Sequence, residues 1–75
     1  MIFTSYEQFQ GLLKVGDYHK AYVHMVSNPE IIEEMTKHDV KTLLKGNPED
    51  ASLVMDFVIG LGKKYGNTKL LESRL

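Results

Sequence analysis

Apolar residues recur along most of the chain at intervals of three and four positions, which is the spacing of one face of an α-helix. Two clear sets are Tyr6, Phe9, Leu12 and Leu13, and then Tyr18, Ala21, Tyr22 and Met25. No stretch of the sequence sustains the two-residue alternation of a half-buried strand, and no Asn-Gly or Asp-Gly hairpin turn occurs. The pattern therefore predicts an all-α protein.

The first helix is bounded by recognisable start and stop signals. Thr4 with Glu7, or Ser5 with Gln8, has the spacing of a capping box, in which a hydroxyl and an acid or amide three residues later satisfy each other's backbone amides. Gly16 follows the last apolar residue of the set, where a left-handed C-cap favours glycine. We expect a helix that opens at this box and stops near Gly16.

Acidic and amide residues mark the later helix starts. Asp17 can cap a second helix that ends before Asn28. The triplet Asn-Pro-Glu occurs at 28–30 and again at 47–49, and each copy places proline at the first helical position and an acid near the positive helix end. Asp39 is expected to cap a further short turn. These signals predict five or six short helices with sharp turns between neighbours.

The most apolar segment follows the second triplet. Between 51 and 61 only Ser52, Asp56 and Gly60 are not strongly apolar, and they lie four residues apart along one thin stripe. A helix that is apolar over most of its circumference has to be surrounded by other elements. We therefore expect a compact orthogonal cluster of five or six short helices around a central apolar helix at about 48–62. Residues 1–75 are expected to form a single helical domain.

Composition limits how this domain can be stabilised and where it can act. The chain has 75 residues, of which 43% are hydrophobic and none is cysteine, so disulfides and thiolate zinc sites cannot support a small core. Uninterrupted apolar runs reach only three residues, too few to cross a membrane. No targeting segment is visible at the N-terminus. We expect a cytoplasmic protein that does not act on membranes.

The residue types that most often carry catalysis or bind metals lack the required spacing. His19 and His24 are five positions apart, and His38 with Glu34 would supply only two ligands, short of a closed zinc site. No Gly-x-Ser-x-Gly elbow occurs, and the glycines and lysines of 60–64 lack the spacing of a phosphate-binding loop. We therefore predict no catalytic, cofactor-binding or metal-binding residues, and a protein that is not an enzyme.

Charge is distributed unevenly although it almost cancels. The total of nine Lys+Arg and ten Asp+Glu gives a net charge of -1. Residues 1–60 hold five lysines and nine acids, whereas residues 61–75 hold three lysines and one arginine against one acid. The chain is thus an acidic body followed by a basic C-terminal segment, 61–75. This segment could meet an acidic partner, or its lysines could simply stabilise the negative end of the preceding helix.

The main hypothesis is a non-enzymatic protein-binding module or small regulator that acts through a helical surface. Its support is a surplus of large apolar and aromatic side chains that a few short helices cannot all bury. They include Phe3, Tyr6, Tyr18, Tyr22 and Tyr65. The partner would be another protein or a second copy in a homodimer. The predicted contact region consists of Lys63, Lys64, Tyr65, Leu71 and Arg74.

Two alternatives remain from the sequence. The first is nucleic-acid binding through the basic segment 61–75, with Tyr65 stacking on a base. The net charge disfavours it, and the helix that would serve as a recognition helix opens with Glu49 and Asp50, which would repel phosphate. The second alternative is a structural component of a larger assembly, with which a small independent helical chain is compatible.

Overall fold

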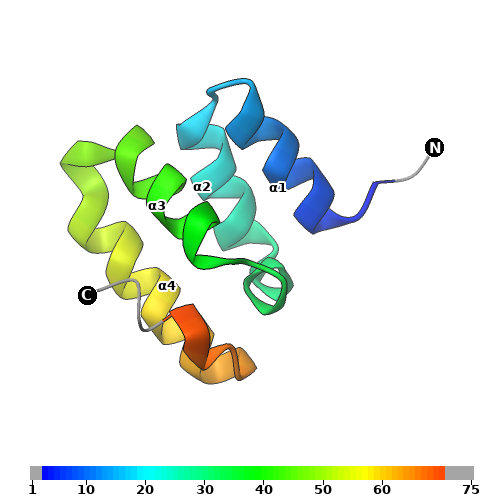
Figure 1. Cartoon of the computed structure of the whole chain (residues 1–75), viewed down its shortest axis with the longest axis vertical. Helices are drawn as coiled ribbons and strands as arrows, with labels where there is room; N and C mark the ends of the chain where they lie inside the picture. Colours follow the sequence, from blue (N-terminus) through cyan, green and yellow to red (C-terminus); the bar gives the residue numbers. More distant parts are fainter. Residues whose placement is uncertain (1–2, 71–75) are drawn as a thin grey trace.

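A computed structural model of the chain describes residues 3–70 (Figure 1). These residues form four α-helices, the 3-10 helices η1 and η2 and a further 3-10 turn at 68–70, and they contain no strand. In chain order the elements are α1 (Ser5–Lys14), α2 (Tyr18–Ser27), η1 (Pro29–Glu33), α3 (Lys37–Gly46), η2 (Pro48–Asp50) and α4 (Ala51–Tyr65). The all-α prediction is confirmed. No helix within 3–70 is long and apolar enough to cross a membrane.

The first helix begins and ends where the sequence signals place it. The Glu7 amide donates to Thr4 Oγ1 at 3.1 Å, and the Thr4 amide donates back to Glu7 Oε1 at 3.1 Å. Of the two possible boxes, the structure therefore uses the one that begins at Thr4. After Lys14 the chain turns through Gly16, whose φ of 81° lies in the left-handed region that favours glycine.

Three predicted starts differ from what the structure shows. Asp39 does not cap α3, because Thr36 takes that role and forms a capping box with it: the Asp39 amide donates to Thr36 Oγ1 at 3.3 Å, and the Thr36 amide donates to Asp39 Oδ2 at 3.1 Å. The Asn-Pro-Glu triplets begin the 3-10 helices η1 and η2 rather than α-helices. Five or six helices are therefore not confirmed, since only four segments within 3–70 are α-helical.

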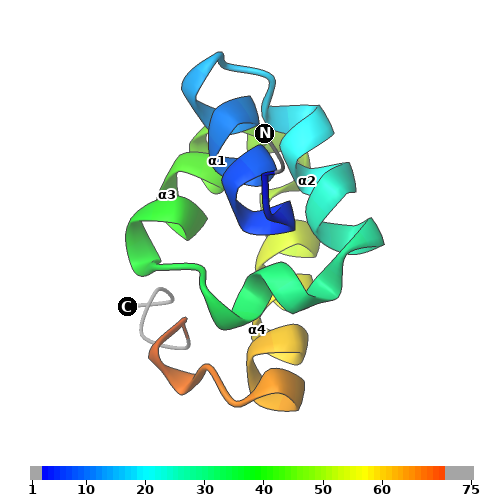
Figure 2. The same ribbon diagram turned by 90° about the vertical axis from the view of Figure 1, so that its right-hand side faces the viewer.

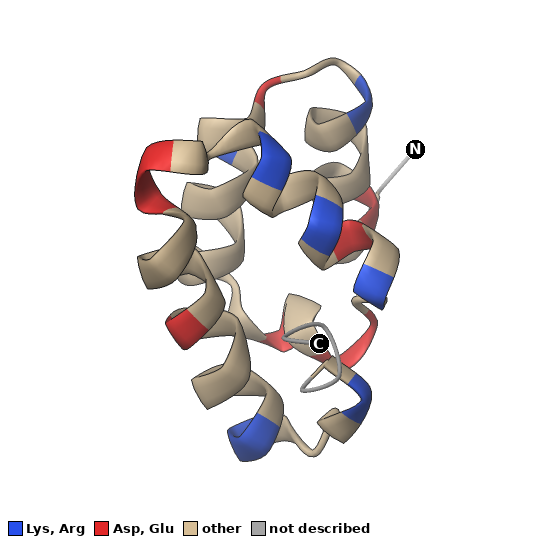
Figure 3. Cartoon of the chain, turned by 60° about the vertical axis from the view of Figure 1, so that its left-hand side comes forward, with Lys and Arg blue, Asp and Glu red and all other residues tan. Residues whose placement is uncertain are grey.

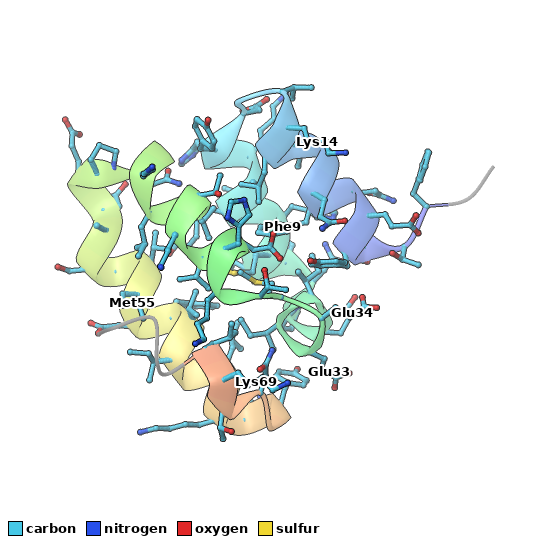
Figure 4. The ribbon with its side chains drawn as sticks, viewed as in Figure 1. Phe9, Lys14, Glu33, Glu34, Met55 and Lys69 are labelled. Carbon is cyan, nitrogen blue, oxygen red and sulfur yellow. The ribbon has the colours of Figure 1, made fainter. Side chains whose placement is uncertain are left out.

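The helices enclose one cluster of buried apolar side chains. α1 and α2 lie side by side, and α4 packs against α3 and η1 (Figures 1 and 2). Phe9 points from α1 into the cluster (Figure 4). The buried members are Phe9, Leu13, Ala21, Met25, Ile31, Ile32, Met35, Val40, Leu43, Val54, Val58 and Leu70. Every α-helix, and η1 as well, contributes to this core.

The central position expected for residues 48–62 is not confirmed. α4 buries one face, with Val54, Val58 and Gly62 against the core. Its opposite face is open, and Leu53 there is 64% exposed. Of the three other α-helices, which have ten residues each, α3 packs against this 15-residue helix, and Tyr22 of α2 meets Phe57 of α4 edge-on. α4 is therefore an outer wall of the bundle with a free surface along its length.

Candidate binding groove at the end of α4

An open groove of about 720 Å³ lies between the end of α4 and the connection from η1 to α3. Residues 33–37 form one wall and residues 65–69 form the other. Glu33 and Glu34 lie on the η1 side of this region and Lys69 lies on the side of the chain that follows α4 (Figure 4). Segments about thirty residues apart in the sequence thus make one site.

The wall at 65–69 is built by a tight reversal of the chain. Gly66 ends α4 with a φ of 80°, and its amide and that of Asn67 both donate to the Gly62 carbonyl. A Cβ on Gly62 would lie 3.0 Å from the Asn67 carbonyl oxygen, which is closer than side-chain carbons normally come. Glycine at both positions lets the chain fold back against its own helix.

Asn67 locks the two walls together. Its Nδ2 donates to the Ile32 carbonyl at 2.7 Å and to the Met35 carbonyl at 3.1 Å. Met35 and Leu70 are buried beside this contact. One side chain therefore satisfies two main-chain carbonyls at the end of η1 and holds the groove at a set width. The sequence indicated Asn67, or else Thr68, only as the cap of a last helical turn, and a 3-10 turn at 68–70 does follow Asn67.

The two walls carry opposite charges. Glu33 and Glu34 are exposed on one side, Lys69 is exposed on the other, and Lys37 lies beside the acids at the start of α3. Figure 3 shows acidic and basic segments close together at this end of the molecule. Half-buried Tyr65 adds an aromatic surface to the groove. A ligand in the groove would meet two carboxylates, two ammonium groups and a phenol ring within one short trough.

The predicted contact region is brought to the groove only in part. Tyr65 lines it, whereas Lys63 and Lys64 are exposed in the last turn of α4 and do not line it. The Lys64 ammonium lies 5.9 Å from the centre of the Tyr65 ring. Leu71 and Arg74 lie outside the described residues. The acidic wall was not anticipated, because no local signal shows that 33–34 face 65–69.

A second polar cluster joins α1 to α3. Asp39 is 5% exposed, and its Oδ2 accepts a 2.6 Å hydrogen bond from the Tyr6 hydroxyl in addition to the capping bond from Thr36. Gln10 Nε2 donates to the Tyr6 oxygen at 3.0 Å. A smaller groove of about 260 Å³ runs beside this cluster. Through these bonds the buried carboxylate fastens α1 to the start of α3.

Because of Tyr6, the protein should lose stability as the pH rises into the alkaline range. Burial, followed by the hydrogen bond to Asp39, raises the pKa of its phenol well above the usual value of 10. Above pH 10 the unfolded chain therefore releases a proton that the folded protein retains, so the free energy of unfolding falls as pH rises. In urea unfolding between about pH 8 and 11, Tyr6→Phe should lose less stability with pH than the wild type. Equal losses in the two proteins would contradict this role.

The histidines and acids do not assemble into a metal site in the described part. Residues 3–70 contain no group of three or more His, Asp or Glu side chains placed to hold a metal ion. His24 is engaged locally, with Nε2 at 3.1 Å from the Ser5 carbonyl and Nδ1 at 3.4 Å from Asn28 Nδ2. Its ring therefore ties the end of α2 to the start of α1.

We compared the chain with family models, curated proteins and solved structures. No family model matches the chain, and no match is found among curated proteins or solved structures.

Proposed function

We propose that the protein is a non-enzymatic binding module, or small regulator, that holds a short segment of a partner protein in the groove between 33–37 and 65–69. The observation that carries this proposal is the pairing of oppositely charged walls across an open trough that Asn67 holds together. Such a site offers hydrogen-bonding and charged groups for the recognition of a partner.

The dimensions of the groove suit a peptide. Its volume of about 720 Å³ falls within the roughly 300 to 1,000 Å³ of typical ligand sites. Glu33 and Glu34 would pair with a lysine or arginine of the segment, and Lys69 with an acid. The Tyr65 ring would cover an apolar side chain between them. Charges placed this way favour one direction of the bound chain and give specificity more than affinity.

The acidic wall argues against the nucleic-acid alternative. A phosphate backbone drawn to Lys63, Lys64 and Lys69 would also approach Glu33 and Glu34, which repel it. A peptide with both charges meets no such conflict. The other alternative, a structural component of a larger assembly, is compatible with this groove. In that case the bound segment would belong to another subunit of the assembly.

Selection of displayed random peptides against the purified protein tests the proposal. We expect enriched peptides to carry a basic residue near an acidic one and to shift the amide resonances of 33–37 and 65–69 on titration. Lys69→Glu should weaken their binding at least about tenfold, since it turns an attraction into a repulsion. The matched control is Lys45→Glu, which changes an exposed lysine at the far end of α3 and should leave binding unchanged.

A second variant separates peptides from nucleic acid. Glu34→Lys should weaken the binding of a peptide whose basic residue contacts the acidic wall. The same substitution should strengthen the binding of a single-stranded oligonucleotide titrated at low salt. Failure to enrich any peptide that distinguishes the wild type from Lys69→Glu would contradict the proposed function. Salt-sensitive oligonucleotide binding that Lys69→Glu abolishes would favour the alternative.

A further inference from the structure

The outer face of α4 is a second surface that the groove does not use. We define this outer face by its exposed residues Ser52, Leu53, Asp56, Gly60 and Lys63. Leu53 leaves 64% of its surface in water. Asp56 and Lys63 make no ion pair within the described part of the chain, where Lys20 and Asp17 form a pair at 3.7 Å.

No contact within the described part of the chain requires glycine at position 60. A glycine inside a helix lowers stability by roughly 0.5 to 1 kcal/mol relative to alanine. The other helical glycines near the core have a reason, since a Cβ on Gly46 would collide with Tyr18 and one on Gly62 would crowd Asn67. A Cβ on Gly60 would meet nothing within 4 Å. Its missing side chain leaves a bare stretch of helix that another backbone can approach closely.

The charges on either side of Gly60 are arranged so that they cannot pair within one helix. Asp56 lies one turn before Gly60, and Lys63 and Lys64 lie one turn after it. A spacing of seven or eight residues separates the two signs by about 10 to 12 Å along the axis, whereas helix ion pairs form at three or four. Figure 3 shows the acidic and basic positions apart along α4.

A second copy of the same helix, running in the opposite direction and crossing at Gly60, would satisfy both signs. Each Asp56 would then face Lys63 and Lys64 of the other copy, once on each side of the twofold axis. The same patch serves both subunits, which is what a twofold interface requires. Leu53 of each copy would pack near the C-terminal end of the other α4, over the methylene stems of the lysines.

We propose that the outer face of α4 is a homodimer interface in which two α4 helices cross antiparallel at Gly60. The helix has 15 residues and is about 22 Å long, so a single helix pair lies at the small end of protein interfaces. The dimer is therefore weak and concentration-dependent, with a Kd between about 10 µM and 1 mM. This interface is independent of the groove.

Sedimentation equilibrium from about 10 µM to 1 mM tests the proposal in this affinity range. Asp56→Lys alone, and Lys63→Glu with Lys64→Glu, should each weaken self-association at least about tenfold, because like charges then face each other. Combining the three substitutions in one chain should restore it. An equimolar mixture of the two weakened variants should form a heterodimer, since one carries only basic and the other only acidic groups at these positions.

Matched glycine variants test the crossing point. Gly60→Gln and Gly11→Gln both place a side chain where a Cβ meets nothing of its own chain, so both should fold at least as stably as the wild type. Only Gly60→Gln should abolish dimerisation. The proposal is overturned by a monomer at every concentration, or by a dimer that is unaffected by the charge reversals. Lys69→Glu should leave dimerisation intact, and Asp56→Lys should leave peptide binding intact, so the two proposals fail separately.

Discussion

Phe9→Ala should lower the free energy of unfolding by about 3 to 5 kcal/mol. Phe9 is 0% exposed and is among the largest fully buried side chains of the described core. Replacing a buried phenylalanine by alanine removes its transfer free energy and leaves a cavity, a loss of about 3 to 5 kcal/mol. A chain of 75 residues has a total stability of only about 4 to 11 kcal/mol. The substitution thus removes a large part of what holds the fold.

Phe3→Ala is the matched control for this substitution. Phe3 is 53% exposed, and its recorded contact is a carbonyl that accepts from Gln8 Nε2, which alanine retains. We expect its free energy of unfolding to change by no more than about 0.5 kcal/mol. Urea unfolding followed by circular dichroism at 222 nm measures both variants. Similar midpoints for Phe3→Ala and Phe9→Ala would show that Phe9 is not the central packing residue.

Gly46→Ala should destabilise the protein by about 1 to 3 kcal/mol, the usual loss when a packed site is overfilled. A Cβ on Gly46 would overlap the Cβ and ring carbons of Tyr18. The Tyr18 Cβ is fixed to the α2 backbone, so relief requires α2 and α3 to separate. That movement also strains the 3.3 Å hydrogen bond from Asn47 Nδ2 to the Tyr18 carbonyl. Thermal unfolding monitored by circular dichroism measures the loss.

Gly11→Ala is the same chemical change, but it should stabilise the protein. Gly11 lies inside α1 with open space where its Cβ would go, so alanine there should stabilise by up to about 1 kcal/mol. In a Tyr18→Gly background the loss at Gly46 should shrink, because both the colliding Cβ and the ring are gone. A Gly46→Ala protein as stable as Gly11→Ala would contradict the close approach of α2 and α3.

Several helix boundaries were predictable from signals that lie within one turn of the boundary. Thr4 with Glu7, the left-handed Gly16 and the end of α2 before Asn28 are all confirmed. Where two residues with capping side chains compete, the local signal does not decide between them. Thr36 begins α3 although Asp39 has good capping chemistry, because the pair satisfies two amides reciprocally when Thr36 comes first.

The candidate site was predictable only in part. Tyr65 was placed in the contact region as one of the surplus aromatic side chains, and it does line the groove. Glu33, Glu34 and Asn67 were not assigned to it, since their relevance depends on where η1 lies against the end of α4. Tyr6 and Asp39 were missed as partners for the same reason, because 33 residues separate the two ends of their hydrogen bond.

The residues alone establish the all-α class, most helix ends and the exposed stripe of Ser52, Asp56 and Gly60, because caps, prolines and apolar periodicity act over distances of one or two helical turns. The tertiary structure decides what each glycine is for and where a groove opens. Gly46 and Gly62 are needed because other segments approach them. Asn67 joins the two walls of the groove by donating to the carbonyls of Ile32 and Met35, which lie 35 and 32 positions earlier in the chain. Contacts of that range depend on how the helices pack, so they leave no signal in any short stretch of the chain.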